Sequence, residues 1–83
     1  MYNGKGKLID SDGNVYEGEF KAGKKDGFGT YKYINGDEYT GPMLNDKKHG
    51  DNGIYKYADG KTVYEGYFEN GLMSGKGKYF ITV

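Results

Sequence analysis

The chain has 83 residues, so there is room for one domain, and a chain this short buries only a modest part of its surface. With 16 Gly and 10 Tyr against one Pro and no Trp, the composition argues against a helical protein, because Gly is a poor helix residue while Tyr favours strands. Lys plus Arg and Asp plus Glu number 12 each, so net charge gives no general attraction to nucleic acid, and no nucleic-acid partner is expected. The absence of Cys excludes disulfides and thiolate nucleophiles.

A unit beginning with Tyr-x-Gly recurs along the chain. It starts at Tyr16, Tyr39 and Tyr64, at intervals of 23 and 25 residues. Each start is followed by a pair of glycines, an aromatic or aliphatic stretch and, where another unit follows, a turn. The glycine pairs are Gly27 and Gly29, Gly50 and Gly53, and Gly75 and Gly77, with Gly4 and Gly6 in a leading half copy. One repeat domain is therefore predicted over 1–83, divided into a half repeat, 1–15, and three repeats, 16–38, 39–63 and 64–83.

Alternating segments between these turns predict an all-β protein, a single-layer antiparallel meander of tandem hairpins. The seven expected strands are 5–10, 15–21, 28–34, 38–44, 53–58, 63–68 and 76–82. Asp12-Gly13, Asn35-Gly36 and Asp59-Gly60 predict tight type I′ turns, which need positive φ at both central residues. The longer connections, 22–27, 45–52 and 69–75, are expected to be looser loops.

Period-two alternation separates an aromatic face from a charged face. The charged face collects residues such as Glu17, Lys32 and Lys56. Gly18, Gly41 and Gly66 fall at strand centres on the aromatic face, where each is expected to leave space for a ring from a neighbouring strand. The aromatic face carries Tyr16, Phe20, Tyr31, Tyr33, Tyr39, Met43, Tyr55, Tyr57, Tyr64, Phe68, Tyr79 and Ile81.

Tyr-x-Gly-x-Phe, a variable loop, Gly-x-Gly and a later Gly before the next Tyr resemble the MORN repeat, and the resemblance covers essentially the whole chain. It implies a hairpin-repeat sheet that acts in protein–protein assembly, with phospholipid contact as a second role attached to the family. The middle unit departs from the pattern, since Asp51-Asn52 lengthen its glycine pair and Pro42-Met43 replace an acidic-aromatic pair. Pro42 has no N–H to donate, so a bulge or a lost ladder bond is expected there.

No catalytic or metal site is expected. His49 falls in a loop, and no nucleophile motif surrounds Ser11 or Ser74, so the protein is predicted not to be an enzyme. The segment 10–14 resembles the start of a calcium loop, but its Gly is fourth rather than sixth and its flanks are strands. The Gly-x-Gly pairs lack the helix start of a phosphate-binding loop. No cofactor and no metal is predicted.

Two lysine pairs occupy equivalent loops of the repeat. Lys24-Lys25 and Lys47-Lys48 are candidates for binding an anionic headgroup, at about 1 kcal/mol per lysine near a charged leaflet. Asp26, Asp46 and Asp51 lie among them and weaken that attraction. Solvated loop lysines are the competing interpretation, so only weak anionic lipid contact is expected.

The aromatic face is the main functional candidate. One interpretation is that its rings pack on one another as the only core. The other is that they form a partner groove, because a single-layer sheet cannot cover its own aromatic face and large exposed apolar patches usually mark contact surfaces. The leading hypothesis is a protein-binding or scaffold module with a protein or peptide partner. The alternatives are a phospholipid-contact module and a self-assembling structural repeat. The candidate partner-binding residues are Tyr16, Phe20, Tyr31, Tyr33, Tyr39, Tyr55, Tyr57, Tyr64, Phe68 and Tyr79.

Two further expectations concern location and assembly. The N-terminus carries no signal-peptide pattern and no apolar run approaches 18 residues, so a soluble cytoplasmic protein is predicted. The last segment, 79–83, has high β-propensity and no side-chain charge, on an outermost strand. Such an edge predicts a homodimer through the C-terminal strand.

Overall fold

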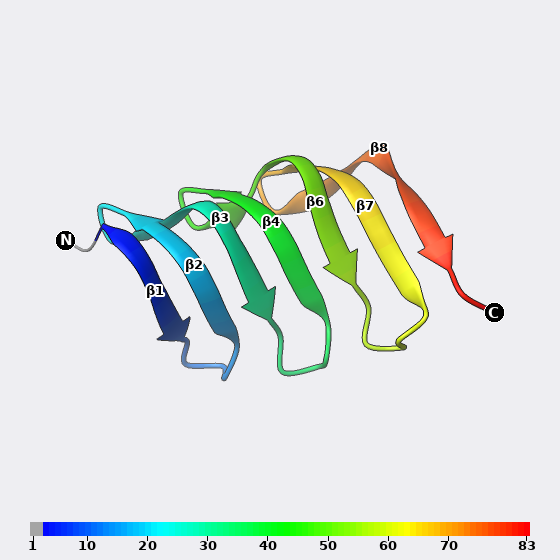
Figure 1. Ribbon diagram of the computed structural model, residues 1–83, viewed down its shortest axis with the longest axis horizontal. Coiled ribbons are helices and arrows are strands. Elements are labelled where there is room, and N and C mark those ends of the chain that lie inside the picture. Colours follow the sequence, from blue (N-terminus) through cyan, green and yellow to red (C-terminus); the bar gives the residue numbers. More distant parts are fainter. Residues whose placement is uncertain (1–2) are drawn as a thin grey trace.

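The computed structural model describes residues 3–83, with the side chain of residue 74 left out, and confirms an all-β fold. One antiparallel sheet has the strand order β1-β2-β3-β4-β6-β7-β8, with β5 paired to β4 (Figure 1). Residues 3–83 contain no helix that could cross a membrane. The strands are β1 (Gly4–Ile9), β2 (Val15–Lys21), β3 (Lys24–Lys32), β4 (Glu38–Leu44), β5 (Lys47–Lys48), β6 (Gly50–Lys56), β7 (Thr62–Glu69) and β8 (Leu72–Ile81).

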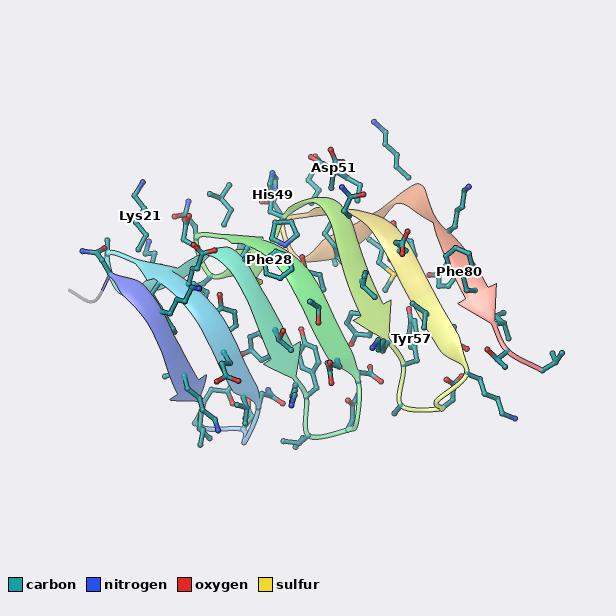
Figure 2. All side chains as sticks on the ribbon, in the orientation of Figure 1. Lys21, Phe28, His49, Asp51, Tyr57 and Phe80 are labelled. Carbon is teal, nitrogen blue, oxygen red and sulfur yellow. The ribbon has the colours of Figure 1, made fainter. Side chains whose placement is uncertain are left out.

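At one end of the strands, the connections differ from the long loops that were expected. They are two-residue turns with positive φ at both positions, which is the type I′ geometry that suits a twisted hairpin. Strands β3, β6 and β8 therefore begin earlier than expected, and β5 is an additional short strand. Lys21, His49 and Asp51 lie at this end of the strands in Figure 2. The three turns are Ala22-Gly23, Asn45-Asp46 and Asn70-Gly71.

The predicted turns lie at the opposite end of the strands, but they are not of type I′. Gly13 has a φ of 92°, whereas the preceding Asp12 is not among the described residues with positive φ. The Gly13 N–H donates to the Asp10 carbonyl at 3.0 Å, and the Asp10 carboxylate accepts the N–H groups of Asp12 and Asn14, each at 3.0 Å. The Asp10 carboxylate therefore caps this turn, whereas a type I′ turn would have positive φ at both Asp12 and Gly13. Gly36 and Gly60 occupy equivalent positions.

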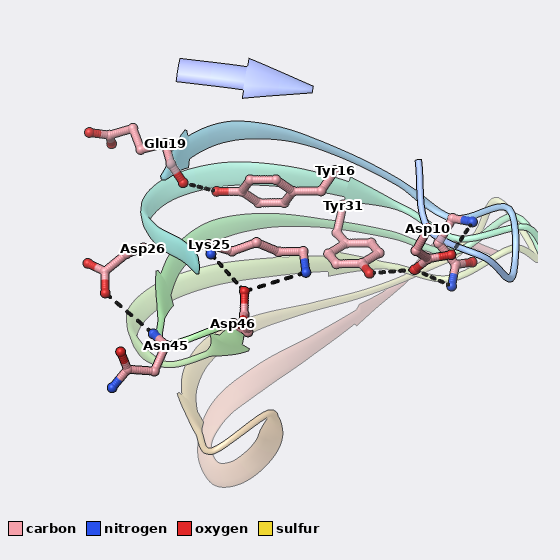
Figure 3. A network of polar contacts seen from close by, with 9 residues as sticks. Asp10, Tyr16, Glu19, Lys25, Asp26, Tyr31, Asn45 and Asp46 are labelled. Atoms are coloured by element: carbon pink, nitrogen blue, oxygen red, sulfur yellow. Dashed lines mark hydrogen bonds and ion pairs between the residues drawn. The ribbon is translucent and has the colours of Figure 1, made fainter. Parts of the chain in front are cut away.

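The hairpins bend because their second strands carry extra residues. Gly18 pairs with Gly29, but Phe20 pairs with Lys25, so the second strand contains two more residues than the first between these points. The same shift occurs between Gly66 and Phe68 of β7 against β8. Bulges of this kind increase local twist and bend a strand pair. The sheet therefore arches, and Figure 3 shows Tyr16, Tyr31 and Lys25 inside the curve of the ribbon.

The middle hairpin is irregular at the position predicted from Pro42. Strand β4 pairs with β6 only from Glu38 to Thr40 and then with the separate strand β5 through Met43 and Leu44. The Pro42 carbonyl accepts the His49 N–H at 3.2 Å. The ladder of β4 is thus interrupted around Pro42, as expected, and the first and third hairpins shift register at the equivalent position without a proline.

Candidate functional site: a tyrosine-lined concave face

The core consists of the tyrosine that begins each repeat. Tyr16, Tyr39 and Tyr64 are at most 1 % exposed and are joined by Phe68 and Met43. A Cβ at Gly29 or Gly77 would collide with the ring of Tyr16 or Tyr64, so these glycines leave room for a ring from the neighbouring strand. At Gly18 and Gly66 a Cβ would chiefly meet the backbone of the opposite glycine. The expected ring space therefore lies over the second-strand glycines rather than over Gly18 and Gly66.

Each core tyrosine is held by its own strand. The hydroxyls of Tyr16, Tyr39 and Tyr64 donate to the carbonyl three residues onward, at 2.9, 2.6 and 3.1 Å respectively. These short-range bonds satisfy a phenol at the bottom of the core. Burial raises the pKa of Tyr16 to about 12 and raises the pKa of Tyr39 as well. Both side chains therefore remain protonated donors at physiological pH.

A second set of tyrosines forms a continuous row over this core. The ring centroids of Tyr31 and Tyr33 are 4.8 Å apart in a stacked pair, and the row continues from Tyr33 to Tyr55 at 5.9 Å. Tyr55 and Tyr57 follow at 5.0 Å, and Tyr57 and Tyr79 at 6.5 Å. We call Tyr31, Tyr33, Tyr55, Tyr57 and Tyr79 the tyrosine row. The first four are half-buried and Tyr79 is 57 % exposed, so solvent reaches all five rings of the tyrosine row.

Carboxylates in the turns anchor one side of the tyrosine row. The Tyr31 hydroxyl donates to Asp10 at 2.9 Å, and the Tyr55 hydroxyl donates to Asp37 at 2.8 Å. Burial and the bond to Asp10 raise the pKa of Tyr31 to about 12, while the same hydroxyl holds the pKa of Asp10 below its ordinary value. Burial also raises the pKa of Tyr57 to about 12. The hydroxyls of Tyr31 and Tyr57 therefore stay protonated at physiological pH, and the bonds to Asp10 and Asp37 fix the rings of Tyr31 and Tyr55.

The two lysine pairs predicted to bind anions are divided by the structure. Lys24 and Lys47 are exposed, but Lys25 and Lys48 turn inward over the rings. Lys25 Nζ lies 5.5 Å from the centroid of Tyr31 and 3.7 Å from the Asp46 carboxylate. Lys48 Nζ donates to the Tyr33 hydroxyl at 2.8 Å and lies 5.8 Å from the centroid of Tyr39. The structure therefore leaves half of the expected cationic surface pointing outward.

The third hairpin has a methionine where the first two have these lysines. Phe20 pairs with Lys25, Met43 with Lys48, and Phe68 with Met73, so Met73 is the equivalent residue. The hydroxyls of Tyr57 and Tyr79 lie 3.5 and 3.4 Å from Met73 Sδ. An open depression of about 440 Å³ lies beside them, lined by Lys48, Tyr55, Tyr57, Leu72 and Met73 among others. Sequence reasoning missed Met73 because it was placed in a loop.

The ten candidate contact residues therefore separate by depth. Tyr16, Tyr39, Tyr64 and Phe68 are at most 1 % exposed, so a partner cannot touch them in this conformation. The five residues of the tyrosine row remain accessible, and Phe20 is half-buried with its ring 5.2 Å from that of Tyr16. The packed-core interpretation is confirmed for the buried set, and the partner groove stays a prediction for the accessible set.

Other sequence candidates lie away from this face. The segment 10–14 is a hairpin turn in which Asp10 bonds to the backbone, as described above. His49 Nδ1 accepts the Asn70 N–H at 3.4 Å, and the His49 ring lies 6.1 Å from that of Tyr67. In β8, an outer strand of the described sheet, Phe80 and Ile81 are 52 and 67 % exposed. The homodimer through β8 stays a prediction.

Comparison with known proteins agrees with this repeat geometry. The MORN repeat profile matches residues 1–15, 16–38, 39–62 and 64–81. The chain belongs to the MORN repeat family. Alsin from rat is 39 % identical over 80 residues, which cover 90 % of this chain and 5 % of alsin. Human alsin is 38 % identical over 80 residues, which cover the same fractions of the two chains.

A shorter relative carries the family name. MORN repeat-containing protein 3 from Xenopus laevis is 46 % identical over 48 residues, covering 58 % of this chain and 20 % of that protein. This MORN chain thus spans a small fraction of the relatives that it matches. The match covers only the repeat sheet, so the activities of these longer proteins are not assigned to this chain.

Proposed function

We propose that this MORN chain is a non-catalytic protein-binding or scaffold module, and that its contact surface is the tyrosine row. The observation that carries the proposal is the continuity of five solvent-reachable rings across three hairpins. The rings are 4.8–6.5 Å apart along the row. Tyrosine suits a contact surface because it offers a large apolar area and a hydroxyl at a small entropic cost.

The shape of the molecule supports an elongated partner. The Cα trace measures 44 × 25 × 16 Å, and the tyrosine row crosses hairpins along the sheet. An extended or helical peptide lying across the strands would contact several rings at once. MORN repeats are generally associated with membrane or protein interaction, which agrees with a binding role without naming the partner.

Phospholipid contact receives less support from the geometry. Lys25 and Lys48, two of the four lysines on which it depended, lie over tyrosine rings, and Lys25 is also paired with Asp46. Lys24 and Lys47 alone would contribute about 2 kcal/mol at a charged leaflet, which corresponds to negligible affinity. Self-assembly through β8 and a cytoplasmic location stay predictions.

Selection of peptides from a random display library tests the proposal. We expect the wild-type protein to enrich peptides with large apolar residues. The double variant Tyr33→Ser/Tyr57→Ser should retain little binding of those peptides, because it removes two rings of the row while leaving the buried core. The matched control Lys32→Ser/Lys56→Ser changes exposed residues of the opposite face and should bind normally. No enrichment, or equal binding by the Tyr33→Ser/Tyr57→Ser variant, would refute the tyrosine row as the contact surface.

A further inference from the structure

Two equivalent lysines of this chain differ in their counter-ion. Lys25 and Lys48 occupy the same register position in the first and second hairpins, and each reaches inward over two tyrosine rings. The tight turn of the following hairpin lies beside each lysine. Asp46 in that turn accepts the Lys25 N–H at 2.7 Å and also lies 3.7 Å from Lys25 Nζ. The first lysine is therefore neutralised within the chain.

Gly71 takes the place of Asp46 beside Lys48. Asp46 and Gly71 are both the second residue of a tight turn, with φ of 69° and 87°. Their N–H groups donate to the equivalent carbonyls, Asp46 to Lys25 at 2.9 Å and Gly71 to Lys48 at 2.8 Å. Because Gly71 has no carboxylate, Lys48 Nζ has no acidic partner within ion-pair distance among residues 3–83.

The lysine left without a carboxylate borders the open depression. Lys48 and Gly71 line it together with Tyr55, Tyr57, Leu72 and Met73. A lysine ammonium has three donors, and the bond to the Tyr33 hydroxyl uses one of them. One cation and an adjoining apolar surface therefore face the same space. The cation disfavours a positively charged ligand there and favours an anion with an apolar neighbour.

We propose that this depression binds a peptide segment in which an aspartate or glutamate adjoins a large apolar residue. The peptide carboxylate occupies the position that the Asp46 carboxylate has beside Lys25 and receives a hydrogen bond from Lys48. The apolar side chain packs against Tyr55, Tyr57 and Met73. The inference rests on the proposed binding role of the tyrosine row and adds to it the chemistry of the partner.

A peptide fits this position better than a membrane surface does. Lys48 reaches over the rings of Tyr33 and Tyr39, and Figure 3 shows its equivalent, Lys25, inside the curve of the ribbon. The exposed lysines, Lys24 and Lys47, flank the turns at the edge. A flat layer of headgroups would meet the turns first, whereas a peptide chain can enter the curve.

Gly71 offers a matched pair of variants for the test. A Cβ at Gly71 meets nothing within 4 Å, and Asp46 shows that an aspartate adopts this turn conformation. Gly71→Asp should supply Lys48 with the missing carboxylate and so compete with the peptide. Gly71→Asn has the same shape without the charge. Lys48→Met, which copies the third hairpin, removes the cation.

The probe is the best peptide selected from the display library, synthesised together with a copy in which its acidic residue is replaced by the amide. Calorimetric titration should show binding of the acidic peptide to Gly71→Asp and Lys48→Met about tenfold weaker than to wild type, as expected for one charge-assisted hydrogen bond. Gly71→Asn adds the same bulk without the charge, so it should bind the acidic peptide more tightly than Gly71→Asp does. The amide peptide should bind wild type as weakly as the acidic peptide binds Gly71→Asp.

The outcomes separate this inference from the proposed function. Peptides that depend on Tyr33 and Tyr57 but show no acidic enrichment would overturn the inference and leave the binding role intact. Equal affinities for Gly71→Asp and Gly71→Asn would also overturn it. So would a result in which these variants change binding to phosphatidylserine vesicles instead of peptides. If no peptide depends on the tyrosine row, the proposed function itself fails.

Discussion

The first-strand and second-strand tyrosines share a residue type and a sheet face but differ in depth. Tyr16, Tyr39 and Tyr64 lie in the core, and their hydroxyls bond to their own strands. Solvent reaches the tyrosine row, whose hydroxyls contact turn carboxylates, Lys48 or the Met73 sulfur. The bend of each hairpin creates this difference, because it folds the strand ends over the first set. Alternation determines the face on which a residue lies, and the bend determines its depth.

Truncation should separate the two sets most strongly. Tyr39→Ala removes a ring that is 0 % exposed and should lower the free energy of unfolding by about 3–5 kcal/mol. That loss is comparable to the whole stability expected for a chain of this size. Tyr33→Ala removes a half-buried ring and should cost about 1.5 kcal/mol or less. Urea unfolding followed by circular dichroism measures both, and equal costs would contradict the division.

Glycine substitution at a strand centre should have the next largest effect. A Cβ at Gly18 would lie 2.5 Å from the Gly29 Cα and 2.7 Å from the Phe28 carbonyl oxygen. Backbone atoms cannot move aside cheaply, so Gly18→Val should cost about 3 kcal/mol despite the strand propensity of valine. Unchanged stability in urea would show that β2 and β3 are farther apart at this point.

Removal of a core hydroxyl tests the bond between each first-strand tyrosine and its own strand. Tyr16→Phe leaves the Glu19 carbonyl without the phenol donor and should cost about 1–2 kcal/mol. Tyr79→Phe is the matched control, since Tyr79 is 57 % exposed and its hydroxyl donates to the Met73 sulfur, a weak acceptor, at 3.4 Å. The control should change stability by less than about 0.5 kcal/mol. Similar losses for both variants would contradict the assignment.

The tight turn at Ala22 should accept a stabilising substitution. Ala22 has a φ of 52°, a left-handed conformation that asparagine tolerates better than alanine. Ala22→Asn should therefore raise the free energy of unfolding by about 0.5–1 kcal/mol. Ala22→Val should lower it, because a β-branched residue is strained there. Thermal melts that rank valine above asparagine would refute the two-residue turn.

The smallest predicted effect is a dependence of the free energy of unfolding on pH. The hydrogen bond from Tyr31 lowers the pKa of Asp10 below the ordinary 3.8. A carboxylate with a depressed folded pKa stabilises the protein above its unfolded pKa, and this stabilisation is lost as pH falls through the folded pKa. Wild type should thus exceed Asp10→Asn in urea midpoint at neutral pH, and the difference should shrink below the ordinary pKa of aspartate. A difference that persists in stronger acid would contradict the carboxylate's role.

The repeat and the strand order follow from local sequence, and for that reason they were predictable. Tyr-x-Gly at 16, 39 and 64 gives the period, and alternation around it places both sets of tyrosines on one face. The turn types were interchanged because Asp12-Gly13 carries a strong hairpin signal, whereas Ala22-Gly23 carries a weak one. Asp10, four residues before Asn14, caps its turn in a way that the dipeptide alone does not reveal.

The sequence predicts which side chains lie on the aromatic face, but it does not predict which of them solvent reaches. The depth of Tyr39 relative to Tyr33 depends on a bend that arises from the register between two strands, and no single strand encodes that register. The inward direction of Lys25 and Lys48 has the same origin, because the extra residues of the second strand lie between Lys25 and Gly29 and between Lys48 and Gly53. The missing counter-ion of Lys48 becomes visible only when Asp46 and Gly71 are aligned as turn residues.

Hydroxyl-radical footprinting read out by mass spectrometry tests the central division most directly, since it reports the solvent access of every tyrosine in one experiment on the folded protein. We predict oxidation of Tyr33, Tyr57 and Tyr79 at rates well above those of Tyr16, Tyr39 and Tyr64. Denaturation in urea should abolish the difference. Equal oxidation of both sets in the folded protein, or protection of the tyrosine row with oxidation of the core set, would contradict the account.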